Sequence, residues 1–110
     1  MNMSRQLLVV LAASCLTAAG VQAANLDAGK AKVKEVCAAC HGEDGNSATP
    51  DYPKLGGQHR DYLAKALRDY KSGLRKNAIM AAFAGALSQD DIENLAAYYG
   101  AQPAVLTSRH

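Results

Sequence analysis

Two cysteines and a histidine in the first half of the chain form the pattern with the most chemical content. They lie in the run Cys37-Ala38-Ala39-Cys40-His41, where two alanines separate the thiols and the imidazole follows directly. A Cys-x-x-Cys-His run is the attachment signature of c-type haem: the thiols form thioether bonds with the porphyrin vinyl groups, and the histidine becomes an axial ligand of the iron. The run therefore predicts one covalently bound haem c, held by Cys37 and Cys40, with His41 as proximal ligand.

Two other kinds of site contain a Cys-x-x-Cys pair, a redox dithiol and a structural zinc site. A thioredoxin-like dithiol needs the pair beside a βαβ pattern, and no strand-like run precedes Cys37. Structural zinc takes about four ligands. Besides the two cysteines only His41, His59 and His110 could contribute, at spacings that match no common zinc finger. Haem attachment is favoured over both alternatives.

The second axial position of the iron needs another donor, and the sequence contains few. Met80 is the only methionine that follows the first few residues. A thioether is soft and weakly basic, so it suits ferrous iron and raises the reduction potential. Two helices between His41 and Met80 could bring the chain to the opposite haem face. Packing of Met80 in an apolar core is the alternative role; His59 is the rival ligand, and His110 lies at the end of the chain.

The first residues are typical of an export leader. Arg5 gives a basic start, an apolar leucine-rich stretch follows, and small residues surround a cleavage pattern that ends at Ala23. We expect residues 1–23 to be a cleaved signal peptide and residues 24–110 to be a monohaem cytochrome c domain in the periplasm. A membrane anchor would need an apolar run of about 20 residues, longer than this one. Lipidation at Cys15 is a second alternative, although alanines precede it where a larger aliphatic residue is usual.

Charge and composition narrow the classes of partner and of fold. Loss of Arg5 with the leader would leave eleven basic and ten acidic residues. The basic residues are not clustered into a stripe. Nucleic acid is therefore not an expected partner. A domain of this size has a small hydrophobic core and usually needs an additional stabilising element, such as disulfides or a bound metal. With one Phe and no Trp, the sequence suits a monomeric domain packed around a covalently held haem.

Apolar spacing and cap residues predict an all-α domain. Helices are expected over about residues 27–37 (with Asp27 as N-cap), 59–72, 79–87 and 89–99. Ser88 and Asp91 have the form of a capping box, and Gly100 is expected to stop the last helix. Residues 42–58 are rich in turn-forming residues. A loop of this length in a compact domain usually has a function, so we predict that it wraps around the haem. The tail after Pro103 is expected to be loosely ordered.

With these motifs in place, the chain resembles the class I c-type cytochromes, and closely the single-haem units of the cytochrome c4 and c5 group. The likeness is carried by Cys37 to Gly42, Gly45-Asn46-Ser47, Pro53 to Gln58, and Leu87 to Tyr99, and covers nearly all of residues 26–102. It implies a small haem-wrapping fold of three to five helices. The first and last helices would cross, with Gly29 and Val33 against Leu95 and Tyr98. Only one attachment signature is present, which predicts a single haem in this chain.

The resemblance also implies roles for individual residues. Pro53 matches the proline whose carbonyl accepts the second N–H of the proximal histidine, and Met80 matches the distal ligand. The loop before Met80 is short and lacks the aromatic residue and prolines of mitochondrial relatives. The contacts with the haem propionates are therefore assigned only to candidates, namely Tyr52, Gln58 and Arg75.

The function implied is that of an exported carrier of single electrons, not an enzyme. Its partners would be a redox donor and acceptor, such as a membrane cytochrome complex, a terminal oxidase or a periplasmic dehydrogenase. An iron with two protein ligands has no open position for substrate, which favours this role. Two alternatives are kept: a haem subunit committed to one dehydrogenase, and a haem enzyme or gas sensor with an exchangeable distal position.

Overall fold

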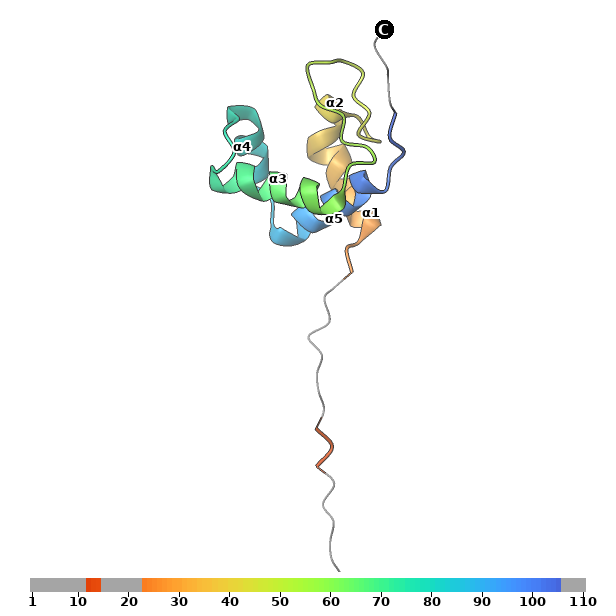
Figure 1. Cartoon of the computed structure of the whole chain (residues 1–110), viewed down its shortest axis with the longest axis vertical. Coiled ribbons are helices and arrows are strands. Elements are labelled where there is room, and N and C mark those ends of the chain that lie inside the picture. The colour runs from red at the N-terminus through yellow and green to blue at the C-terminus, as the bar shows by residue number, and fades with distance from the viewer. Residues whose placement is uncertain (1–11, 15–22, 106–110) are drawn as a thin grey trace, which may run out of the picture.

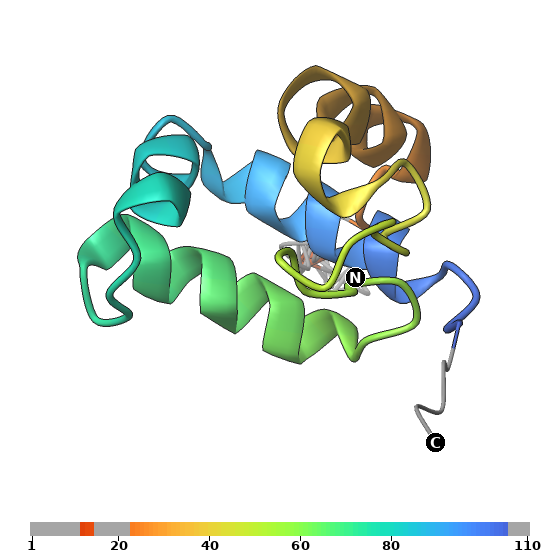
Figure 2. The ribbon, with the colours of Figure 1, turned by 90° about the horizontal axis from the view of Figure 1, so that it is seen from above.

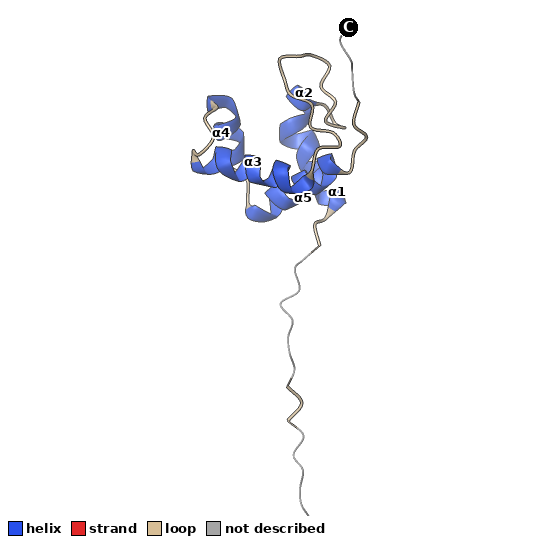
Figure 3. Ribbon diagram, in the orientation of Figure 1, coloured by secondary structure: helices blue, strands red, loops and turns tan. Residues whose placement is uncertain are grey.

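The computed structural model describes residues 12–14 and 23–105, and within these ranges it consists of helices and loops (Figures 1 and 3). The predicted all-α class is confirmed, since no described residue lies in a strand. No helix in this part of the chain is both long enough and apolar enough to cross a bilayer. Cys15, His110 and most of the predicted signal peptide over residues 1–23 lie outside the described residues.

A continuous helical stretch opens the domain. It consists of α1 (Leu26–Lys32), the π-helical turn η1 (Val33–Cys37) and the short α2 (Ala38–His41). The side chain of Asn25 accepts a 3.0 Å hydrogen bond from the backbone N–H of Ala28 and caps the stretch. The expectation that Asp27 is the N-cap is therefore wrong, and Asp27 lies in the first turn, where its charge favours the helix dipole.

The π-helical turn ends at Cys37, the first residue of the attachment motif. The backbone N–H of Ala38 bonds to the carbonyl of Val33, five residues back instead of four. Such wide turns are rare and frequently occur at functional sites. Here Val33 at the start of the turn is fully buried in the core, while Cys37 at its end and His41 in α2 line a cavity.

Three further helices complete the fold: α3 (Arg60–Ser72), α4 (Ala78–Gly85) and α5 (Gln89–Gly100). Gly73 ends α3 in the left-handed conformation that glycine adopts most easily. Ser88 and Asp91 form the predicted capping box of α5, each side chain bonding the other's backbone N–H. Gly100 is the last residue of α5, with Ala101 as C-cap, so the expected stop at Gly100 is one residue early.

The core is formed where α5 packs against α1 and α3. Its largest fully buried side chains are Ile92, Leu95 and Val33. Figure 2 shows α3 and α5 running along the length of the domain, with α4 at one end and the first helical stretch across the other side. The predicted crossing of the first and last helices is confirmed by the close contact of Gly29 with Asn94 and Tyr98.

The segment after α5 is held against the loop between α2 and α3. The side-chain amide of Asn46 donates to the carbonyl of Pro103 at 3.0 Å, and its oxygen accepts the N–H of Val105 at 3.1 Å. The expectation of a loosely ordered tail after Pro103 is therefore wrong as far as Val105. Residues 106–110 lie outside the described part of the chain.

Candidate haem site

A cavity of about 340 Å³ lies between the first helical stretch, the 42–58 loop, α3, α4 and α5. Its volume falls in the range of about 300–1,000 Å³ that proteins use for ligands and cofactors. Its lining includes every residue that was predicted to lie at the haem site: Cys37, Cys40, His41, Tyr52, Pro53, Gln58, Arg75 and Met80. The rival ligand His59 is exposed at the N-cap of α3 and is absent from the lining.

His41 is held in one orientation by the loop that follows it. Its Nδ1 atom lies 2.9 Å from the carbonyl oxygen of Pro53, and the residue is only 8% exposed. A carbonyl can only accept, so Nδ1 carries the hydrogen and Nε2 keeps its lone pair for a metal. The buried Ser47 hydroxyl donates to the carbonyl of Tyr52 at 2.6 Å, which fixes the turn that presents Pro53.

The two thiols are half-buried at the cavity wall and are not joined in a disulfide. Burial raises the pKa of the Cys37 thiol to about 11, although Lys32 opposes the shift. The thiolate is the form that binds zinc and attacks disulfides, and a thiol with a raised pKa is a poor source of it. This environment weighs against the redox-dithiol alternative. Zinc is disfavoured on other grounds, since within residues 12–14 and 23–105 no group of three or more His, Cys, Asp or Glu side chains is placed to hold a metal ion.

Met80 lies in the first turn of α4 and is half-buried at the cavity. Asn77 caps this helix, since its side-chain oxygen accepts the backbone N–H groups of Ile79 at 3.1 Å and Met80 at 3.0 Å. The cap fixes the start of α4 and with it the backbone of Met80. In the sequence, the only indication of this cap is an Asn two residues before Ile79.

The apolar side chains that line the cavity show that a large apolar group fits there. Tyr62, Ile79 and Phe83 are 50%, 62% and 45% exposed, unusually high for large apolar residues, and all three line the cavity. A porphyrin has two broad apolar faces and would cover such side chains. Two cysteines, a histidine with a free lone pair and a thioether line the same cavity, and together they form a donor set that suits haem iron.

The propionate candidates lie at the cavity but already have protein contacts. Arg75 donates to the Tyr62 hydroxyl at 3.3 Å and lies 4.9 Å from the centre of the Tyr70 ring. The side-chain oxygen of Gln58 accepts the N–H of His59 at 3.0 Å. Sequence reasoning missed Tyr62 and Phe83 as cavity residues, because helical spacing alone does not tell a core face from a cofactor face.

Comparisons with known proteins agree with this site. The family model for cytochrome c oxidase, cbb3-type, subunit III matches residues 24–98. Cytochrome c4 of Thiocapsa roseopersicina is 46% identical over 86 residues, which are 78% of this chain and 44% of that protein. This chain belongs to the class I c-type cytochromes of the cytochrome c4 group. Proteins of this kind carry haem c covalently and transfer electrons, and Cys37, Cys40 and His41 form the attachment motif.

Solved structures and a further relative extend the likeness. The crystal structure of reduced cytochrome c4 from Pseudomonas stutzeri has 43% identity and a TM-score of 0.68, and the match covers 74% of this chain and 47% of that one. The thiosulfate dehydrogenase electron acceptor of Stutzerimonas stutzeri is 42% identical over 69 residues, 62% of this chain and 32% of that protein. This cytochrome chain thus spans about half the length of the cytochrome c4 relatives that it matches.

Proposed function

We propose that this chain is an exported monohaem electron carrier whose iron is ligated by His41 and Met80. The observation that carries the proposal is that one cavity is lined by Cys37 at the end of η1, by Cys40 and His41 of α2, and by Met80 of α4. Haem iron supplies the redox chemistry by cycling between its ferric and ferrous forms. With both axial positions taken by side chains, no site is left for a substrate, which favours transfer of electrons over catalysis.

The protein side chains would serve this role by holding the ligands still. Pro53 accepts the hydrogen of His41 Nδ1, which fixes the ring and makes Nε2 a better donor. Asn77 fixes the start of the helix that carries Met80. A soft thioether stabilises ferrous iron and so raises the reduction potential. Tyr52, Gln58 and Arg75 are proposed as the polar groups nearest the propionates.

The proposed leader predicts the compartment of the protein, and the proposed electron transfer predicts its class of partner. Cleavage after Ala23 would release residues 24–110 as a monomeric domain into the periplasm. Its donor and acceptor would be redox proteins, such as a membrane cytochrome complex, a terminal oxidase or a periplasmic dehydrogenase. Intact-mass measurement of the periplasmic form tests the leader: a mass that retains residues 1–23, or acyl chains on Cys15, would contradict it.

A second candidate function is that of a cytochrome dedicated to one dehydrogenase. It is favoured by the likeness to a protein named as a thiosulfate dehydrogenase electron acceptor. A dedicated subunit would copurify with its dehydrogenase and accept electrons from that enzyme alone. A free carrier would instead be isolated by itself and exchange electrons with several redox proteins.

The ligation is tested with Met80→Ala, made in a His59→Gln background so that His59 cannot substitute. We expect haem to stay covalently attached, the weak ferric sulfur-to-iron absorption band to disappear, and cyanide to bind the ferric iron more tightly. Retention of that band in the Met80→Ala protein would show that Met80 is only a packing residue. An open iron in the parent protein would instead favour the enzyme or gas-sensor alternative.

A further inference from the structure

The helix that carries Met80 is held at both ends by side chains that lie outside it. Asn77 caps its start, and Lys71, from the last turn of α3, reaches its end. We propose that Lys71 is a positioning residue that keeps Met80 on the iron by restraining the end of α4. The inference rests on the proposed ligation of the iron by Met80.

The contact is made by an ammonium group with two backbone oxygens. Lys71 Nζ lies 3.1 Å from the carbonyl oxygen of Gly85, the last residue of α4, and 2.6 Å from that of Leu87. Carbonyls at the end of a helix have no partner within the helix and carry the negative end of its dipole. A cation that donates to these carbonyls supplies the missing hydrogen bonds and also offsets the negative end of the dipole. Such charge-assisted hydrogen bonds are stronger than neutral ones.

On its own α4 has little to stabilise it. It has 8 residues, and isolated helices below about 12–15 residues are marginal in water. Ala84 is its one buried residue in the structure, and Ile79 and Phe83 face the cavity. Elements with few buried contacts open locally at a lower free energy than the whole domain. Besides the haem, which would cover Ile79 and Phe83, and the packing of α4 on α3, side-chain contacts such as that of Lys71 are therefore needed to restrain α4.

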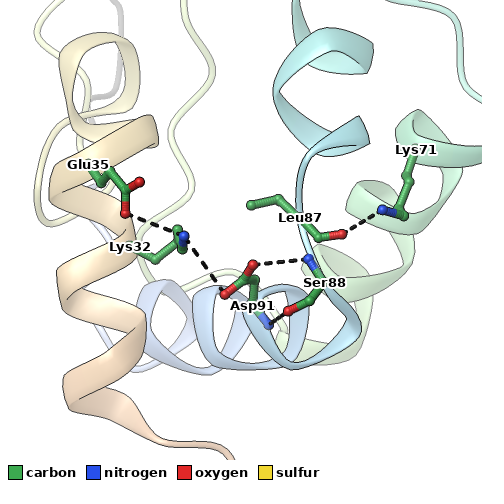
Figure 4. A network of polar contacts seen from close by, with 6 residues as sticks. All are labelled: Lys32, Glu35, Lys71, Leu87, Ser88 and Asp91. Atoms are coloured by element: carbon green, nitrogen blue, oxygen red, sulfur yellow. Dashed lines mark hydrogen bonds and ion pairs between the residues drawn. The ribbon is translucent and has the colours of Figure 1, made fainter.

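Lys71 connects α4 to the buried core of the fold. Leu87, whose oxygen it binds, is 5% exposed and directly precedes Ser88 of the α5 capping box. Figure 4 shows this arrangement: Lys71 bonds Leu87, Ser88 and Asp91 bond each other, and Asp91 faces Lys32 of α1 at 4.0 Å. The end of α4 is thus tied to α3 on one side and to the start of α5 on the other.

Loss of the ammonium group should let α4 open more often and release Met80 from the iron. Lys71→Met keeps most of the side-chain stem and removes the donor. Imidazole can bind ferric iron only after the thioether leaves, so its apparent affinity reports the population of the open form. We expect Lys71→Met to raise this affinity about 5- to 30-fold. Lys71→Arg, which keeps charged donors, should give a smaller increase.

Lys65→Met is the matched control. It removes the same charge from the same helix, but the Lys65 ammonium pairs with Asp69 of α3 and not with α4. Both variants change the net charge equally, so a general electrostatic effect on the iron would appear in both. Equal imidazole affinities for Lys71→Met and Lys65→Met would overturn the proposal.

A double-mutant comparison separates this inference from the proposed ligation. In the Met80→Ala protein the iron is already open, so adding Lys71→Met should change imidazole affinity no further. If Met80→Ala raises the affinity and Lys71→Met alone does not, the positioning role fails and the ligation stands. If Met80→Ala itself leaves the affinity unchanged, the ligation by Met80 fails and the positioning role fails with it.

Hydrogen exchange of the holoprotein gives a readout that does not depend on the iron's ligands. Amide protection in α4 should fall in Lys71→Met relative to Lys65→Met, while protection in the core of α5 falls less. A uniform loss across α4 and α5 would mean that Lys71 supports only global stability, and would overturn the proposal.

Discussion

Gly29 packs so closely on the backbone of Asn94 that a Cβ atom at Gly29 would lie 2.3 Å from the Asn94 carbonyl oxygen. The two residues lie on α1 and α5, the helices whose crossing forms much of the core. Asn94 also accepts the N–H of Asn25 at 2.8 Å, so its position is fixed from two sides. Backbone atoms held in this way cannot move aside for a methyl group.

Gly29→Ala should therefore destabilise the domain. Alanine favours the helix by up to about 1 kcal/mol, but overpacking of a fixed contact costs about 1–3 kcal/mol or more. We expect a net loss of stability in denaturant unfolding of the ferric holoprotein. Gly85→Ala is the control, since nothing lies within 4 Å of its would-be Cβ. A Gly29→Ala protein as stable as Gly85→Ala would contradict the close crossing.

This crossing illustrates what the sequence could predict. Gly29 within an apolar helical pattern indicated a close approach, and the capping box of Ser88 and Asp91 was recognised because its residues are three apart. The Cys-x-x-Cys-His run specified the attachment site, and the resemblance pointed to Pro53, whose carbonyl oxygen lies 2.9 Å from His41 Nδ1. Such features rest on local spacing or on a motif.

Features that depend on contacts between distant segments could not be predicted from the sequence. The π-helical turn that ends at Cys37 differs from an α-helix by hydrogen bonds to the carbonyl five residues back instead of four, and apolar spacing in the sequence does not distinguish the two. The bonds of Lys71 to the end of α4 join residues 14 and 16 positions apart, and those of Asn46 to the C-terminal segment join residues 57 and 59 positions apart. Neither residue propensities nor the spacing of apolar residues predicts which distant residues will form such hydrogen bonds.

The hydroxyl of Tyr99 should contribute to stability through its bond to Gly42. It donates to the Gly42 carbonyl at 2.9 Å and is buried in the core. That carbonyl also accepts the N–H of Gly45 at 3.2 Å, so Tyr99→Phe leaves it one partner. We expect a loss of about 1 kcal/mol at neutral pH. Tyr98→Phe, whose hydroxyl makes no hydrogen bond within the described residues, should change stability less.

The same hydroxyl gives a pH dependence with a definite sign. Burial holds the pKa of the Tyr99 hydroxyl well above its usual value. The unfolded chain, with a tyrosine pKa near about 10, therefore releases the proton first as pH rises. The stabilisation is present below about pH 10 and is lost above it. Urea unfolding from pH 8 upward should show a steeper loss in the parent than in Tyr99→Phe; equal slopes would contradict the burial of this group.

Ser47 is expected to affect the iron through the loop rather than by contact. Its hydroxyl bonds the carbonyls of Tyr52 at 2.6 Å and Thr49 at 3.2 Å, next to the Pro53 carbonyl that orients His41. Ser47→Ala should cost about 1 kcal/mol and loosen the bond to His41. A less basic imidazole stabilises ferric iron less, so the reduction potential should rise.

Ser72→Ala provides the comparison for Ser47→Ala. The Ser72 hydroxyl bonds the Asp69 carbonyl at 3.3 Å on an exposed helix end, away from the proximal loop. A surface change of this kind usually stays within about 0.5 kcal/mol, and the potential should not move. If Ser47→Ala lowers stability but leaves the potential at the parent value, the loop does not tune His41.

Met80→His should lower the reduction potential if Met80 is the distal ligand. Imidazole is a stronger donor than a thioether and stabilises ferric iron, and axial ligands set haem potentials over a range of about 0.8 V. A drop on the order of a tenth of a volt is expected in a spectroelectrochemical titration, with haem still attached through Cys37 and Cys40. His59→Gln in the same protein keeps His59 from taking the site. An unchanged potential in Met80→His would mean that the imidazole does not reach the iron, and that the cavity contact of Met80 is one of packing alone.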